Sequence, residues 1–141
     1  MHKILLIDDE PDILRVLAMS LRADGYEVVT AASGEKGLAA FAEQRPDIVL
    51  VDIKMPGLDG IDVLQQVKAQ DTLSEVIIIT CHGDVDNAVE ALKHGASDFI
   101  NKPVRYDTLA IALKSAAEKL AIRGQLRYHT LELEAKVEAA T

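Results

Sequence analysis

Short apolar runs recur along the first hundred residues of the chain, with longer mixed segments between them. The first, third and fourth runs are almost continuous in Ile, Leu and Val, a pattern typical of parallel strands buried on both faces. The runs predict five strands, at Lys3–Ile7, Tyr26–Thr30, Asp47–Val51, Val76–Thr80 and Asp98–Ile100.

The mixed segments have the apolar spacing of helices that pack on a sheet. Pro11 suits the first turn of the first helix and Gly25 its end, while Ser33, Asp59 and Asp84 are placed to begin the next three helices. The residues expected to face the core are Ile13, Leu14, Leu17, Leu21, Leu38, Phe41, Ile61, Leu64, Val67 and, in a thin fourth stripe, Ala88, Val89 and Leu92. The alternation predicts an open α/β domain with helices on both faces.

The chain from Arg105 onward has a different pattern, because it lacks proline and repeats apolar residues at helical steps. Two stripes follow each other, Leu109, Leu113, Ala116 and Leu120, and then Leu126, Thr130, Leu133, Val137 and Ala140. They are out of register by one residue across Gly124. We predict a domain over residues 1–120 and a helical extension over residues 121–141, with coiled-coil character and a kink at Gly124. A frayed tail is the alternative.

The charge of the chain limits the partners that it can bind. It has 23 acidic and 15 basic residues, a formal net charge of −8. The imbalance lies before Arg105, where 18 acidic residues face 9 basic ones. Such a surface repels a phosphate backbone, so we expect no direct binding of nucleic acid by this segment.

Length and pattern favour a globular protein outside the membrane. A chain of 141 residues can bury a core of its own, and none of its apolar runs is long enough to span a bilayer. Met1 leads directly into a strand-like run, so no signal peptide is expected. Cys81 is the single cysteine, which favours a reducing compartment, and we predict a cytoplasmic protein.

Polar side chains follow the predicted strands at the edge where open α/β sheets bind ligands. Asp8 and Asp9 follow the first strand, and Asp52 follows the third. Thr80 ends the fourth strand, and Lys102 follows the fifth. Carboxylates at about 4 Å repel one another by roughly 4 kcal/mol per pair at an effective dielectric of about 20. A hard divalent cation such as Mg²⁺ would offset this repulsion in an all-oxygen site.

This combination of groups favours phosphoryl transfer. A carboxylate can attack phosphorus, a metal ion and the Lys102 ammonium can stabilise phosphoryl oxygens, and the Thr80 hydroxyl can bond the product. Glu10 and Asp12, taken singly, are better interpreted as helix-capping residues.

Four motifs at these strand ends carry a family resemblance. They are LLIDDEPDI at 5–13, IVLVDIKMPGLDG at 48–60, IIITCHGD at 77–84 and GASDFINKP at 95–103. Over residues 1–120 the chain resembles the receiver domains of bacterial two-component response regulators. The resemblance implies a flavodoxin-like fold with strand order 2-1-3-4-5, and a phosphorylation-activated signalling switch that is not an enzyme. It also implies that a sensor histidine kinase or phosphotransfer protein supplies the phosphoryl group.

The resemblance also implies roles for individual residues. Asp52 would be the phosphoacceptor, and Lys102 would pair with the phosphoryl group. Mg²⁺ would be bound directly by Asp9, Asp52 and the backbone carbonyl of Lys54. Asp8 would bind the ion through water.

Two further positions match the switch residues of the family. Thr80 would bond the phosphoryl group, and Phe99 would then turn inward, although Phe99 is also compatible with a plain core position. The change would alter the surface of the fourth helix, fifth strand and fifth helix, and two copies could pair through that surface or through the C-terminal helix. The Lys102–Pro103 bond is cis in the family.

Cys81 departs from the family pattern, in which the residue after the switch Thr is Ala, Gly or Ser. Its larger side chain would lie at the rim of the site, where we expect it to hinder access. His82 beside it is interpreted as a solvated loop residue.

Two other classes fit parts of the pattern. A Mg²⁺-dependent phosphohydrolase of the haloacid dehalogenase type also forms an aspartyl-phosphate, but it needs an Asp where this chain has Lys54. A flavodoxin needs a phosphate cradle in its first loop, where Asp8 and Asp9 would repel phosphate.

Overall fold

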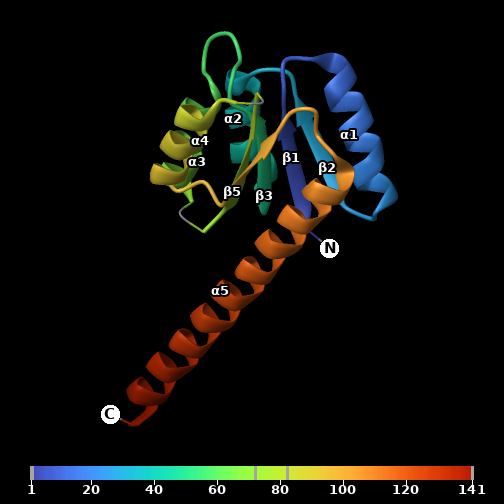
Figure 1. Ribbon diagram of the computed structural model, residues 1–141. Helices are drawn as coiled ribbons and strands as arrows, with labels where there is room; N and C mark the ends of the chain where they lie inside the picture. Colours follow the sequence, from blue (N-terminus) through green and yellow to red (C-terminus); the bar gives the residue numbers. More distant parts are fainter. Residues whose placement is uncertain (1, 72, 82, 141) are drawn as a thin grey trace.

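The computed structural model describes residues 2–71, 73–81 and 83–140, with side chains described as far as Arg123. Within these residues, five parallel strands form one sheet in the order β2-β1-β3-β4-β5 (Figure 1). The strands are β1 (Lys3–Ile7), β2 (Glu27–Ala31), β3 (Ile48–Asp52), β4 (Glu75–Thr80) and β5 (Asp98–Asn101). The predicted fold class and the implied strand order are confirmed.

Helices cover both faces of this sheet. The described part of the chain contains α1 (Pro11–Ala23), α2 (Gly34–Gln44), α3 (Gly60–Gln70), α4 (Val85–Lys93) and α5 (Tyr106–Ala140). Alternate residues of each strand point to opposite faces, so Ile4 and Leu6 pack with α1 and α5, while Leu5 and Ile7 pack with α2, α3 and α4. The continuous apolar runs therefore follow from burial on both sides.

Two of the predicted helix starts are built as expected. The Ser33 hydroxyl accepts the Lys36 N–H at 3.1 Å at the start of α2. Asp59 and Asp62 form a reciprocal capping box at the start of α3, which fixes the end of the loop that leaves Asp52. Asp84 precedes α4 but makes no capping bond with its side chain.

The predicted apolar stripe of α4 is wrong at two of its three positions. Ala88 is buried, whereas Val89 and Leu92 are 44% and 43% exposed. The helix packs through small side chains, Ala88 and Ala91. The larger residues of α4 consequently face outward.

The C-terminal helix extends well beyond the sheet, as Figure 1 shows. Leu109, Leu113 and Ala116 of α5 are buried in the core, and Leu120 packs at its margin. The backbone stays helical through Gly124, where we expected a kink, as far as Ala140. The side chains of the second predicted stripe, Leu126, Thr130, Leu133, Val137 and Ala140, lie outside the described residues.

Candidate functional site

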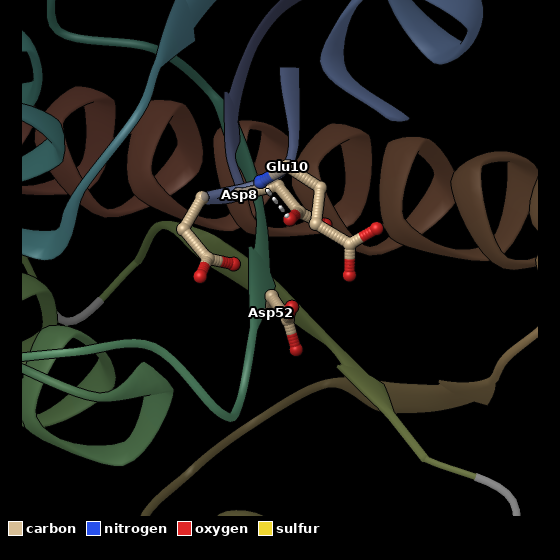
Figure 2. Close-up of side chains that lie close together, drawn as sticks. Asp8, Glu10 and Asp52 are labelled. Atoms are coloured by element: carbon tan, nitrogen blue, oxygen red, sulfur yellow. Dashed lines mark hydrogen bonds between the residues drawn. The ribbon is translucent and has the colours of Figure 1, made fainter. Parts of the chain in front are cut away.

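The carboxyl ends of the strands bring the predicted site residues to one edge of the sheet. Asp8 follows β1, Asp52 is the last residue of β3, and Thr80 is the last residue of β4. Asp8 and Asp52 are buried, and their carboxylates lie near that of Glu10 (Figure 2). The parallel order of the strands thus assembles groups that are distant in the sequence.

Four acidic residues share this edge. Asp8, Asp9, Glu10 and Asp52 each offer a carboxylate oxygen, and these oxygens all lie within 4.8 Å of one another. The pKa of Asp8 is raised to about 6, mainly by burial; the charge of Asp52 adds to the rise, and the Glu10 N–H opposes it. The structure therefore places four carboxylates close together, two of them on the buried residues Asp8 and Asp52.

Lys102 is the cation that faces this cluster. Its Nζ donates to Asp52 Oδ2 at 2.8 Å and lies 3.6 Å from Glu10 Oε1 and 3.9 Å from Asp8 Oδ2. Burial lowers the pKa of Lys102, but the hydrogen bond and charge of Asp52 outweigh it and raise the pKa overall. Lys102 is therefore held charged beside Asp52. The Lys102–Pro103 bond is cis, as the resemblance implied.

Glu10 belongs to the site, contrary to its interpretation as a helix cap. It precedes α1, but its carboxylate makes no capping bond; its backbone N–H instead donates to Asp8 Oδ1 at 2.9 Å (dashed in Figure 2). The Asp8-Asp9-Glu10 run could have indicated this, because Glu10 shares the turn that aims Asp8 at the edge.

Thr80 has a partner that the sequence did not suggest. It is fully buried, and its hydroxyl donates to Asn101 Oδ1 at 3.0 Å. Asn101 pairs with Thr80 in the register of β4 and β5 and directly precedes Lys102. Phe99 is 37% exposed on β5, so its interpretation as a core residue is wrong.

The loop after β3 is tied to both Asp52 and α4. The Lys54 N–H donates to Asp52 Oδ1 at 3.2 Å, and Lys54 Nζ pairs with Asp84 Oδ2 at 3.7 Å. Cys81 is half-buried after β4. His82, the other residue singled out there, lies outside the described residues.

The donor set fits a hard divalent cation. All four cluster residues supply oxygen, which Mg²⁺ prefers, and the buried Asp8 Oδ2 accepts no hydrogen bond. Among the described residues, Lys102 is paired with this cluster and supplies one positive charge against four carboxylates. A cation is the simplest complement to this arrangement.

The comparisons with known proteins agree with the site. A family model described as the response regulator receiver domain matches residues 4–114. This chain belongs to that family. It is thus a phosphoacceptor signalling module and not an enzyme, and the phosphohydrolase and flavodoxin alternatives are set aside.

Similar receiver domains occur in longer regulators. The chain is 35% identical to the regulatory protein AtoC of Escherichia coli over 90% of this chain and 28% of AtoC. It is 37% identical to the transcriptional regulatory protein KdpE of Mycobacterium tuberculosis over 94% of this chain and 58% of KdpE. The chain therefore spans less than two thirds of the length of these curated relatives.

Solved structures show the same fold. A receiver domain protein from Clostridium thermocellum superposes with a TM-score of 0.84 at 43% identity, covering 86% of this chain and 98% of that chain. The receiver domain of NtrX from Brucella abortus gives a TM-score of 0.78 at 38% identity, covering 82% and 98%.

Membership of the family implies a cognate histidine kinase. The acidic cluster of this receiver domain is typical of a Mg²⁺ site. Among the described residues, no helix combines the length and apolar character needed to cross a membrane.

Proposed function

We propose that Asp52 is the residue of this receiver domain that accepts the phosphoryl group, from a phosphohistidine of a sensor kinase or phosphotransfer protein. The observation that carries the proposal is the position of Asp52, at the end of the central strand β3 and 2.8 Å from the Lys102 ammonium. In the transfer, an Asp52 carboxylate oxygen attacks phosphorus. The P–N bond of the donor breaks, and its electron pair stays on the imidazole.

The neighbouring residues would serve this transfer in different ways. Asp9, Asp52 and the Lys54 carbonyl would hold Mg²⁺ directly, with Asp8 holding it through water. The bound ion would supply charge neutralisation for the phosphoryl oxygens. Lys102, already hydrogen-bonded to Asp52, would move its ammonium onto a phosphoryl oxygen.

Thr80 and Phe99 would convert phosphorylation into a change of surface. The Thr80 hydroxyl would leave Asn101 and donate to a phosphoryl oxygen, and the exposed Phe99 would turn into the space that Thr80 vacates. Such a movement repacks β5 against the α4 face, where Val89 and Leu92 are already exposed.

The output of the domain would be a change in pairing with a second copy. Exposed apolar side chains of α4, β5 and α5, together with the extended α5 helix, offer two surfaces for this pairing. Light scattering before and after deletion of residues 124–141 tests the helix: a monomer in both cases refutes pairing through it. Because Cys81 is the single cysteine, we place this function in the cytoplasm.

Phosphate uptake tests the assignment of Asp52. The wild-type chain, mixed with a small acyl phosphate and Mg²⁺, should gain one phosphoryl group by intact-mass spectrometry. Asp52→Asn should gain none, while the control Asp12→Asn, which alters an exposed carboxylate on α1, should behave as wild type. Unchanged uptake by Asp52→Asn would refute the assignment.

A further inference from the structure

A further buried carboxylate lies at the opposite edge of the sheet from the acidic cluster. Glu75 is the first residue of β4 and is 1% exposed. One of its oxygens, Oε1, is ion-paired with Nη1 of Arg123 on α5. The other, Oε2, accepts a hydrogen bond from the Ser97 hydroxyl, directly before β5. Glu75 therefore joins β4, β5 and α5.

Arg123 makes more than one contact at this edge. Its Nη1 also donates to the Leu73 carbonyl oxygen at 3.0 Å, in the loop between α3 and β4. Lys68 of α3 reaches the same loop and donates from Nζ to the Ser74 carbonyl oxygen at 2.5 Å. A single guanidinium thus links α5 to both a strand and the loop that leads into it.

The ion pair between Arg123 and Glu75 lies at the point along α5 where the helix leaves the core. Leu109, Leu113 and Ala116 hold the first part of the helix in the core, but Ile122 is 56% exposed and Leu120 lies at the core margin. A helix that leaves the core has little apolar burial to fix its direction. Its ion pair with a buried carboxylate supplies a directional contact where apolar packing ends.

The same two strands also end at the phosphoryl site. Thr80 donates to Asn101 at one end of the β4–β5 pair, and Glu75 accepts from Ser97 near the other end. Backbone hydrogen bonds connect the ends along the strands, including Ser97 N–H to the Val76 carbonyl oxygen at 2.8 Å. A displacement of β5 at Asn101 therefore has a short, hydrogen-bonded route to Ser97 and Glu75.

We propose that the Glu75–Arg123 ion pair is the joint that fixes the outgoing part of α5 to the sheet, and that movement of β4 and β5 reaches the helix through it. Its second half rests on the proposed function, whereas the first half is independent of phosphorylation.

The anchoring role is tested without phosphorylation. Backbone hydrogen exchange over residues 117–123 and the Tm are compared for wild type, Arg123→Met, Glu75→Gln and the double variant. The control is Arg105→Met, which removes an exposed guanidinium paired only at the surface with Asp107.

Arg123→Met should raise exchange in this segment at least about tenfold and lower the Tm by about 6–10 °C, because it removes the guanidinium that is ion-paired with the buried Glu75 carboxylate. Glu75→Gln should lower the Tm less than Arg123→Met does, since the half-exposed Arg123 can be rehydrated. The double variant should recover at least half of the loss caused by Arg123→Met. The anchoring role is refuted if Arg123→Met changes exchange and Tm no more than Arg105→Met does. It is also refuted if the losses in Tm caused by Arg123→Met and Glu75→Gln simply add in the double variant.

The transmitting role is tested by repeating the exchange after reaction with acyl phosphate and Mg²⁺, with uptake checked by intact mass. Phosphorylation should change exchange over residues 117–123 at least about twofold in wild type and Arg105→Met, and the change should vanish in Arg123→Met. A change that persists in Arg123→Met, or is missing from phosphorylated wild type, refutes transmission. Absent uptake would contradict the proposed function instead, leaving the anchoring test to decide the first half.

Discussion

Buried carboxylates lie at both edges of the sheet, but their surroundings differ. At the carboxyl edge, Asp8, Glu10 and Asp52 share the Lys102 ammonium, and Asp9 adds a fourth carboxylate to the cluster. At the amino edge, Glu75 has an arginine on one oxygen and a serine on the other. One edge carries an excess of negative charge, and the other is locally balanced.

The difference separates a site for ligands from a structural contact. Excess buried charge costs stability, so it persists where an added cation or phosphoryl group completes it. A buried carboxylate that is already paired holds elements of the protein together and needs no ligand. Variants at the two edges should accordingly respond differently to Mg²⁺ and to pH.

The largest effect, on the rate of phosphoryl uptake, is expected from substitution of Lys102 at the carboxyl edge. Lys102→Met should slow phosphoryl uptake by roughly 100-fold or more, because it removes the ammonium that is hydrogen-bonded to Asp52 and placed to stabilise the transferred oxygens. The rate is measured by intact mass against time at fixed acyl phosphate and Mg²⁺. Lys54→Met, which removes an exposed ammonium but keeps the backbone carbonyl, is the matched control. Similar rates for both variants would contradict the role of Lys102.

Removal of one carboxylate should weaken Mg²⁺ binding. Asp9→Asn should raise the Kd for Mg²⁺ at least about tenfold, since it exchanges a charged oxygen ligand for a neutral one. Calorimetric titration measures this directly, and Asp12→Asn, just outside the cluster, should leave the Kd within about twofold. Equal affinities for Asp9→Asn and wild type would remove Asp9 from the metal site.

The repulsion at Asp8 predicts a variant that stabilises the metal-free protein. Burial raises the pKa of Asp8 to about 6, so its folded form favours the proton and its charge opposes folding above that pH. In chelator at pH 7.5, Asp8→Asn should increase the free energy of unfolding by about 1–2 kcal/mol.

The difference in free energy of unfolding between Asp8→Asn and wild type should depend on pH, and the two pKa values of Asp8 give its direction. The stability that protonated Asp8 contributes to the folded state is fully present below its unfolded pKa of 3.8 and is lost as the pH rises through its folded pKa of about 6. Wild type and Asp8→Asn should therefore be equally stable near pH 3.8, diverge up to pH 6 and keep a constant gap above it. Urea unfolding at several pH values measures the gap; a gap that is independent of pH would contradict this origin.

The smallest effect is expected at the rim of the site. Cys81→Gly should speed phosphorylation by small acyl phosphates about two- to threefold, equivalent to a barrier lower by roughly half a kcal/mol. The half-buried Cys81 side chain lies directly after Thr80, and glycine removes its bulk. Equal rates for the two proteins would make Cys81 a neutral substitution.

The sequence by itself predicted the carboxyl edge well. Parallel strands joined by helices must all end at the same edge, so Asp8, Asp52, Thr80 and Lys102 could be placed together from the apolar runs alone. The runs themselves were readable because both faces of the sheet are buried, which leaves little room for polar residues within a strand.

Other features required the tertiary structure. Glu75 lay just outside the predicted fourth strand because a charged residue ends an apolar run, and nothing in the pattern connects it with Arg123. The exposure of Val89 and Leu92 likewise depends on which face of α4 packs against the rest of the domain, and that face carries Ala88 and Ala91.

The dividing line is physical. Periodicity determined the strands, the helices and the shared edge of the site, because these follow from local spacing and the handedness of parallel connections. Side-chain partnerships, such as Glu10 with Lys102, Thr80 with Asn101 and Glu75 with Arg123, were decided only when packing set the distances between elements. Whether a buried charge is tolerated depends on such partners, and the periodicity of the sequence does not predict them.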